Sequence, residues 1–109
     1  MELNPNYIFE LQAEMLSALS NPKRLMILKV LGKGEKTVGE IAVQVGIELT
    51  NVSQHLRIMK AHGIVISRRD GQTVYYKLGA PIFAKCCELV RQAIVENLEK
   101  KSALIARYQ

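Results

Sequence analysis

The sequence of 109 residues has no long apolar run, no tryptophan, only two histidines and only two cysteines. No stretch approaches the ~20 apolar residues that span a bilayer, which argues against a membrane protein. Residues 1–15 contain neither a basic segment nor a cleavage site of small residues, so we expect no signal peptide and a cytoplasmic protein. The cysteines, Cys86 and Cys87, are adjacent, and adjacent residues do not form a relaxed disulfide. A structural disulfide is therefore not expected.

Motifs typical of enzymes are also missing. The chain has no glycine-rich phosphate-binding loop. His55 and His62 have no cysteine or carboxylate at a spacing typical of catalysis or metal binding, so we predict neither an enzyme nor a histidine-based metal site. No linker, repeat or low-complexity segment interrupts the chain, and 49% of its residues are apolar. We therefore expect one domain over residues 1–109.

Positive charge is concentrated in one segment. The net charge is +5, and residues 49–77 alone carry five basic side chains against one acidic side chain. Localised positive charge favours binding to a polyanion such as nucleic acid. A mildly basic domain without such a partner is the other interpretation of charge alone.

Apolar residues at three- and four-residue spacing predict five helices: residues 7–19, residues 22–31, a short helix between Thr37 and Gly46, residues 49–62 and residues 81–104. The second helix begins at Asn21-Pro22, a capping residue followed by a proline that suits the first helical position. The third begins with Thr37 and Glu40, the spacing of a capping box. The third and fourth helices, joined by a short turn at Gly46, form a predicted helix-turn-helix.

The fourth predicted helix has two different sides. Val52, Leu56 and Met59 fall on one side and are expected to pack inward. The side chains that fall away from them are polar: Thr50, Asn51, Ser53, Gln54 and Arg57. They form either an ordinary solvated face or the surface that reads base edges in a DNA major groove.

A hairpin follows this helix. Ile64–Arg69 and Thr73–Leu78 are rich in β-forming residues and are separated by Asp70-Gly71, a strong turn sequence. The order of elements predicts a winged helix-turn-helix, a mainly α fold with a small β-hairpin. Arg68 and Arg69 alternate sides of a strand, so only one of them can face DNA directly.

The last predicted helix carries more apolar surface than a small domain can cover. Its stripe contains Ile82, Cys86, Leu89, Ala93 and Leu98. We predict that this helix, with the first helix, forms a homodimer surface. The alternative is that the last helix lies across the core of its own chain.

Four stretches resemble the ArsR/SmtB family of bacterial and archaeal transcriptional repressors: "LSNPKRLMILKVL" (19–31), "TVGEIAVQVGI" (37–47), "VSQHLRIMKAHGIV" (52–65) and "RRDGQTVYYKL" (68–78). The resemblance implies a homodimer that holds a palindromic operator in double-stranded DNA and releases it when an inducer binds. Ser53, Gln54 and His55 match the Ser-Gln-His triplet of the family's recognition helix. Glu48 and Leu49 depart from the usual Ser-Gln at the helix start.

Chemistry then divides the predicted DNA contacts. Gln54 suits adenine, and Arg57 suits guanine or a phosphate. His55 either contacts DNA or is satisfied inside the protein, and Lys60 is either a phosphate contact or a solvated charge. The full predicted set on the helix is Thr50, Asn51, Ser53, Gln54, His55, Arg57 and Lys60. On the predicted hairpin, which is the wing of this fold, the set is Arg68, Arg69, Gln72 and Thr73.

The metal sites of the family are not predicted here. The Cys-x-Cys that some members carry in the third helix is replaced by Ala42 and Gln44. The zinc ligands that others carry on the last helix are replaced by Ala80, Ile82 and Ala93, and only Glu96 could coordinate a metal. No cofactor is therefore expected from this resemblance.

The cysteine pair leaves two interpretations open. Cys86 is either a small core residue beside an incidental Cys87, or the pair binds a thiophilic metal or metalloid, such as copper(I) or arsenite, or is oxidised. Lys85 beside them would favour the thiolate. Redox-sensing family members place cysteines in the second and last helices, and the second helix here has none.

A function from a different class is also consistent with this fold. The chain could be a protein-interaction module whose basic segment serves only solubility. A salt titration separates the two, because DNA binding weakens steeply with salt.

Overall fold

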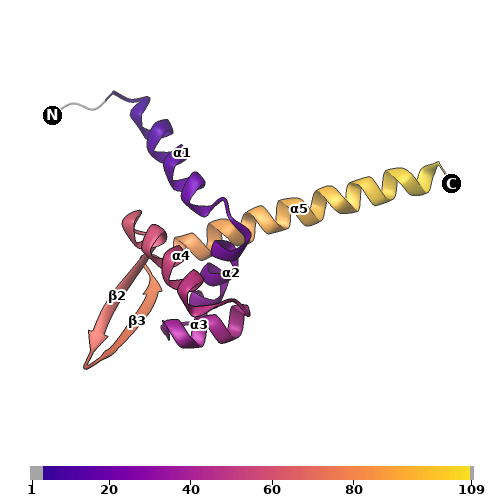
Figure 1. Ribbon diagram of the computed structural model, residues 1–109. Helices are drawn as coiled ribbons and strands as arrows, with labels where there is room; N and C mark the ends of the chain where they lie inside the picture. The colour runs from indigo at the N-terminus through magenta and orange to yellow at the C-terminus, as the bar shows by residue number, and fades with distance from the viewer. Residues whose placement is uncertain (1–3, 109) are drawn as a thin grey trace.

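The computed structural model describes residues 4–108 (Figure 1). Residues 1–3 and 109, the ends of the predicted domain, lie outside the described residues. The elements are α1 (Tyr7–Leu19), α2 (Pro22–Leu31), β1 (Lys36–Thr37), α3 (Val38–Val45), α4 (Leu49–Ala61), β2 (Val65–Asp70), β3 (Thr73–Leu78) and α5 (Ile82–Arg107). This order confirms the predicted winged helix-turn-helix.

The predicted ends of the central helices are confirmed by their capping contacts. The Asn21 side chain accepts hydrogen bonds from the backbone N–H groups of Lys23 and Arg24 at the start of α2. Thr37 and Glu40 form the predicted capping box at the start of α3. Gly46 ends α3 with a φ of 75°, a left-handed conformation that glycine adopts without strain. The turn at Gly46 therefore directs the chain from α3 into α4.

The core lies where α2, α3 and α4 meet the start of the hairpin (Figure 1). The inward positions predicted for α3 and α4 are confirmed, since these side chains are buried: Ile41, Val45, Val52, Leu56 and Met59. Ile27, Leu28 and Leu31 fill the same core from α2, and Ile64 and Val65 close it from the hairpin. This packing fixes α4 by one side and leaves its other side at the surface.

The sheet has three strands where the sequence predicted two. Its order is β1-β3-β2, with all neighbours antiparallel. β1 was missed because a strand of two residues, Lys36–Thr37, is too short to show a period of two. β2 and β3 pair from Val65↔Leu78 to Asp70↔Thr73, so the hairpin loop is Gly71 and Gln72.

Helices α1 and α5 project away from the core in different directions (Figure 1). The radius of gyration is 17.5 Å, whereas a compact chain of this length has about 13 Å. In α1 only Ala18 and Leu19 are buried, and no residue of α5 is buried. α5 extends to Arg107, beyond the predicted end near residue 104. None of the helices between residues 4 and 108 combines the length and apolar character of a membrane span.

Candidate nucleic-acid interface

Helix α4 has a polar side at the surface and an apolar side buried in the core. Val52, Leu56 and Met59 have no exposed surface. The predicted contact residues of the first turns are all exposed: Thr50, Asn51, Ser53, Gln54 and Arg57. Because the apolar side of α4 is packed in the core, the helix holds its exposed side chains in a defined direction. Sequence-specific recognition requires side chains that are positioned in this way.

Glu48 and Leu49, which depart from the Ser-Gln usual in the resembled family, lie at the start of α4. Glu48 is the residue before the helix, is exposed, and makes no capping hydrogen bond with its side chain. Leu49 is 54% exposed and does not belong to the core.

His55 has an internal partner, one of the two environments that the sequence left open. The guanidinium Nε of Arg24 donates a hydrogen bond to His55 Nδ1 at 3.2 Å. Burial lowers the pKa of His55, and the charges of Arg24 and Lys23 lower it further. Sequence reasoning missed Arg24, because the two residues are 31 positions apart and no local pattern relates them.

We expect the protein to lose stability as the pH falls below 6.5, the ordinary pKa of the His55 side chain. The folded pKa is lower, so the unfolded chain binds a proton more readily than the folded chain. The stability that depends on neutral His55 is fully present above pH 6.5 and is lost as the pH falls toward the folded pKa. Urea unfolding measured at several values from about pH 7.5 to about 5.5 tests this. His55→Gln should flatten the profile, and an equally steep profile for this variant would contradict the assignment.

Lys60 links α4 to the hairpin. Its Nζ donates a hydrogen bond to the Ser67 hydroxyl of β2 at 2.6 Å. Both residues lie at the surface, so Lys60 is neither isolated nor buried. The contact joins the predicted wing to the last turn of α4.

Arg68, one of the two predicted wing arginines, is paired within the chain. Its Nη2 and Nε donate to the two carboxylate oxygens of Glu35 at 2.6 and 2.9 Å. Its guanidinium also stacks over the Tyr75 ring, 4.5 Å from the ring centre. The hydrogen bond from Arg68 lowers the pKa of Glu35, and the same pair raises the pKa of Arg68. Glu35 lies 33 residues before Arg68, too far for sequence spacing to relate them.

The remaining predicted wing residues, Arg69, Gln72 and Thr73, are exposed. Side chains alternate along a strand, so Val65, Ser67 and Arg69 share one side of β2. Ser67 contacts α4 through Lys60, so Arg69 lies on the side of β2 that faces α4. The structure therefore places Arg69 and Arg68 on opposite sides of the wing.

The two cysteines lie in different environments. These environments are the reverse of the first interpretation, in which Cys86 was the core residue and Cys87 was incidental. Cys87 is half-buried and packs against the core, whereas Cys86 is exposed. Burial raises the pKa of the Cys87 thiol, and nearby Cys86 raises it further, opposite to the thiolate that Lys85 was expected to favour. Both cysteines line an apolar groove of about 930 Å³ between α2 and α5. Within residues 4–108 no group of three or more His, Cys, Asp and Glu side chains could hold a metal ion.

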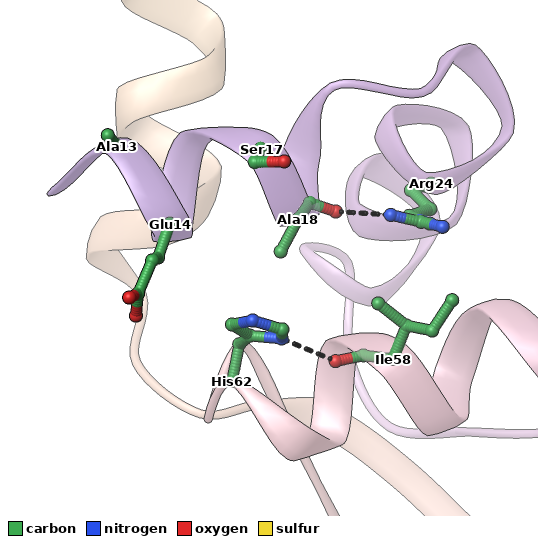
Figure 2. Close-up of a pocket in the computed structure, with 7 residues that line it drawn as sticks. All are labelled: Ala13, Glu14, Ser17, Ala18, Arg24, Ile58 and His62. Carbon is green, nitrogen blue, oxygen red and sulfur yellow. Dashed lines mark hydrogen bonds between the residues drawn. The ribbon is translucent and has the colours of Figure 1, made fainter. Parts of the chain in front are cut away.

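A second, smaller pocket of about 440 Å³ marks the junction of α1, α2 and α4 (Figure 2). Arg24 lies at this junction, where its Nη1 donates a hydrogen bond to the carbonyl of Ala18 at 3.0 Å. His62, the residue that follows α4, donates through Nδ1 to the carbonyl of Ile58 at 3.0 Å, so its ring is bound to the end of that helix. The full lining is Ala13, Glu14, Ser17, Ala18, Arg24, Ile58 and His62.

Comparison with known proteins agrees with this geometry. A family model described as a helix-turn-helix domain matches residues 19–68. The HTH-type transcriptional regulator Rv0081 of Mycobacterium tuberculosis is 33% identical over 106 residues, covering 96% of this chain and 91% of that protein. A biofilm growth-associated repressor of Xylella fastidiosa is 40% identical over 78 residues, covering 72% of this chain and 66% of that protein.

Solved structures give the same result. The crystal structure of Rv0081 is 32% identical and matches with a TM-score of 0.79, covering 92% of this chain and 99% of that chain. The homodimeric winged helix-turn-helix DNA-binding domain Mb0332 of Mycobacterium bovis, a possible ArsR-family regulator, is 33% identical. It matches with a TM-score of 0.78 and covers 90% of this chain and 93% of that domain. The chain therefore belongs to the ArsR/SmtB family of winged helix-turn-helix transcriptional regulators.

Proposed function

We propose that this protein is a cytoplasmic, homodimeric repressor that binds a palindromic operator in double-stranded DNA. In this proposal α4 enters the major groove and the wing meets the backbone or the minor groove. The observation that carries it is the exposed polar face of α4, anchored by the buried Val52, Leu56 and Met59. The related repressor and the homodimeric DNA-binding domain support it over a protein-interaction module.

The polar face of α4 supplies the proposed base contacts. Gln54 has the donor and acceptor that pair with the major-groove edge of adenine, and Arg57 suits guanine or a phosphate. Thr50, Asn51 and Ser53 are short side chains suited to phosphate oxygens or base edges near the helix start. His55 adds a further contact from the next turn, and Lys60 contacts the backbone beside the wing.

The wing supplies phosphate contacts in this proposal. Arg69, Gln72 and Thr73 are exposed, and Arg69 lies on the side of β2 that faces α4. Arg68 is held by Glu35 on the other side of the strand. Counterions leave DNA when a cationic side chain neutralises a phosphate. An arginine whose charge is already paired with a carboxylate neutralises a phosphate poorly, so we expect it to contribute little to counterion release.

We expect the two wing arginines to respond differently to substitution. Arg69→Ala should reduce the slope of log affinity against log salt by about 0.9 per subunit, because one phosphate contact is lost. Arg68→Ala should leave the slope nearly unchanged, because its charge is paired with Glu35. Fluorescence anisotropy on one duplex over a range of salt concentrations measures both, with Arg107→Ala on α5 as the control. Equal slopes for Arg68→Ala and Arg69→Ala would contradict the assignment.

The proposed dimer surface lies on α1 and α5. Large apolar side chains along both helices are more than a third exposed. On α1 they are Tyr7, Ile8, Phe9, Leu11 and Leu16, and on α5 they include Leu89, Val90, Ile94, Leu98, Leu104 and Ile105. Extended exposed apolar surface of this kind marks a site of association. A second copy of the chain is the proposed occupant, as in the homodimeric relative.

Selection of bound duplexes from a random pool tests the proposed function. We expect enrichment of two inverted half-sites whose centres are about 10 base pairs apart, one helical turn. Binding to the enriched duplex should fall steeply with salt and should exceed binding to random DNA. A pool that remains random after repeated selection would overturn the proposed function.

A further inference from the structure

The side chain of Arg24 joins three helices. It projects from α2, donates through Nε to His55 Nδ1 of α4 at 3.2 Å, and donates through Nη1 to the Ala18 carbonyl of α1 at 3.0 Å (Figure 2 shows the second bond). Ala18 lies in the last turn of α1, where carbonyl groups have no partner inside the helix. One planar guanidinium therefore connects the end of α1, part of the proposed dimer surface, to α4, the proposed DNA-recognition helix.

This contact determines which nitrogen of His55 carries the proton. Arginine has only donors, so His55 Nδ1 must be the acceptor of the bond. In a neutral imidazole the proton then resides on Nε2. Within residues 4–108 no hydrogen bond engages Nε2, and the ring is only half-buried, next to the exposed Gln54. Nε2 is therefore a donor without a partner at the edge of the polar face of α4.

We propose that Arg24 is a positioning residue, which fixes His55 as an Nε2–H donor for a hydrogen-bond acceptor on DNA and ties that donor to the end of α1. The inference rests on the proposed function, since it concerns the same DNA interface. The acceptor is a phosphate oxygen or an acceptor atom of a purine edge. Because the same guanidinium also bonds the Ala18 carbonyl, a shift of α1 would move Arg24 and change its hydrogen bond to His55.

Two substitutions of His55 separate this role from a structural one. Glutamine places its amide nitrogen near the position of Nε2, so His55→Gln keeps the outward donor and loses the acceptor for Arg24. Asparagine places its amide oxygen near the position of Nδ1, so His55→Asn keeps the acceptor and loses the outward donor. A purely structural His55 would tolerate asparagine better than glutamine.

The experiment measures operator affinity at about pH 8, where His55 is neutral. We expect His55→Gln to bind within about threefold of the wild type and His55→Asn to bind roughly tenfold more weakly, the effect of one lost hydrogen bond. Arg24→Met should weaken binding roughly fivefold in the wild type and should have little effect in His55→Gln, because it acts through His55. Lys23→Met removes a neighbouring exposed cation that has no hydrogen bond to His55, and it is the matched control.

Nitrogen NMR of the His55 ring gives a readout that does not depend on DNA. The wild type and Lys23→Met should show a single Nε2–H tautomer, and Arg24→Met should show a mixture. A wild-type Nδ1–H tautomer, or asparagine binding better than glutamine, would overturn the inference while leaving the proposed function intact. Failure of the wild type to bind any selected duplex would overturn both.

The same affinities on variant duplexes identify the acceptor. If His55 donates to a phosphate, His55→Asn loses affinity equally on all sequences. If it donates to a purine, the loss is confined to duplexes that carry that base, and the preference at one base pair per half-site is relaxed.

Discussion

Replacing Ile94 with glutamate is expected to convert the protein to monomers and to weaken operator binding by about a hundredfold or more. The Ile94 side chain is 54% exposed on α5, within the proposed dimer surface. A carboxylate there would have to lose its water when two copies associate, which is strongly unfavourable. Each subunit alone would keep its α4 but would lose the gain from binding both half-sites together. Analytical ultracentrifugation and operator anisotropy measure the two effects.

Gln92→Glu is the matched control for this prediction. It introduces the same negative charge only two residues away, which on a helix is nearly the opposite side. Gln92 is also exposed, so the control should remain a dimer and should bind the operator almost as the wild type does. A dimeric Ile94→Glu, or equal effects of both substitutions, would show that the exposed apolar side chains around Ile94 do not form the association surface.

Replacing Gln54 with alanine is expected to weaken operator binding by roughly 1–3 kcal/mol and to relax the preference at one base pair in each half-site. Gln54 is exposed on the first turns of α4, and its amide can make two hydrogen bonds to one adenine. Alanine leaves those two groups of the base without partners. Affinities for the selected operator and for each single-base variant measure the effect.

The affinity for random DNA provides the internal control. It should change little in Gln54→Ala, because non-specific binding depends on phosphate contacts. Gln92→Ala on α5 should leave both affinities unchanged. A loss of equal size on operator and random DNA would mean that Gln54 contacts the backbone and does not read a base.

Local sequence rules were sufficient for most of the helices and for the hairpin. Asn21-Pro22, the capping box at Thr37 and the stop at Gly46 each act through contacts within a few residues. Such contacts are visible in sequence spacing, and the structure confirms them. The buried side of α4 was predictable for the same reason, because its position in the core follows from helical periodicity.

Contacts between distant segments were not predictable. Arg24 meets His55 across 31 positions, and Arg68 meets Glu35 across 33. Nothing in the local pattern distinguishes these arginines from solvated ones. The two-residue strand β1 was missed for a related reason, because its existence depends on pairing with β3.

The orientation of α5 explains the error at the cysteines. Near its start, Phe83, Ala84 and Cys87 pack against the core, and beyond them the helix leaves the core. The longer apolar stripe that includes Cys86 lies at the surface of the chain. The prediction therefore placed the wrong cysteine against the core, because the short part of α5 that packs there includes Cys87 and not Cys86.

The distance between the two reading helices of the dimer is the most direct test of the account. A spin label at Glu48→Cys, in a Cys86→Ser/Cys87→Ser background, would mark the start of each α4 at an exposed position. Electron–electron double resonance on the purified protein should give one main distance near ~34 Å, the spacing of successive major grooves on one face of B-DNA. Isolated spins, or a distance far from one helical turn, would contradict a dimer that presents two reading helices to one operator.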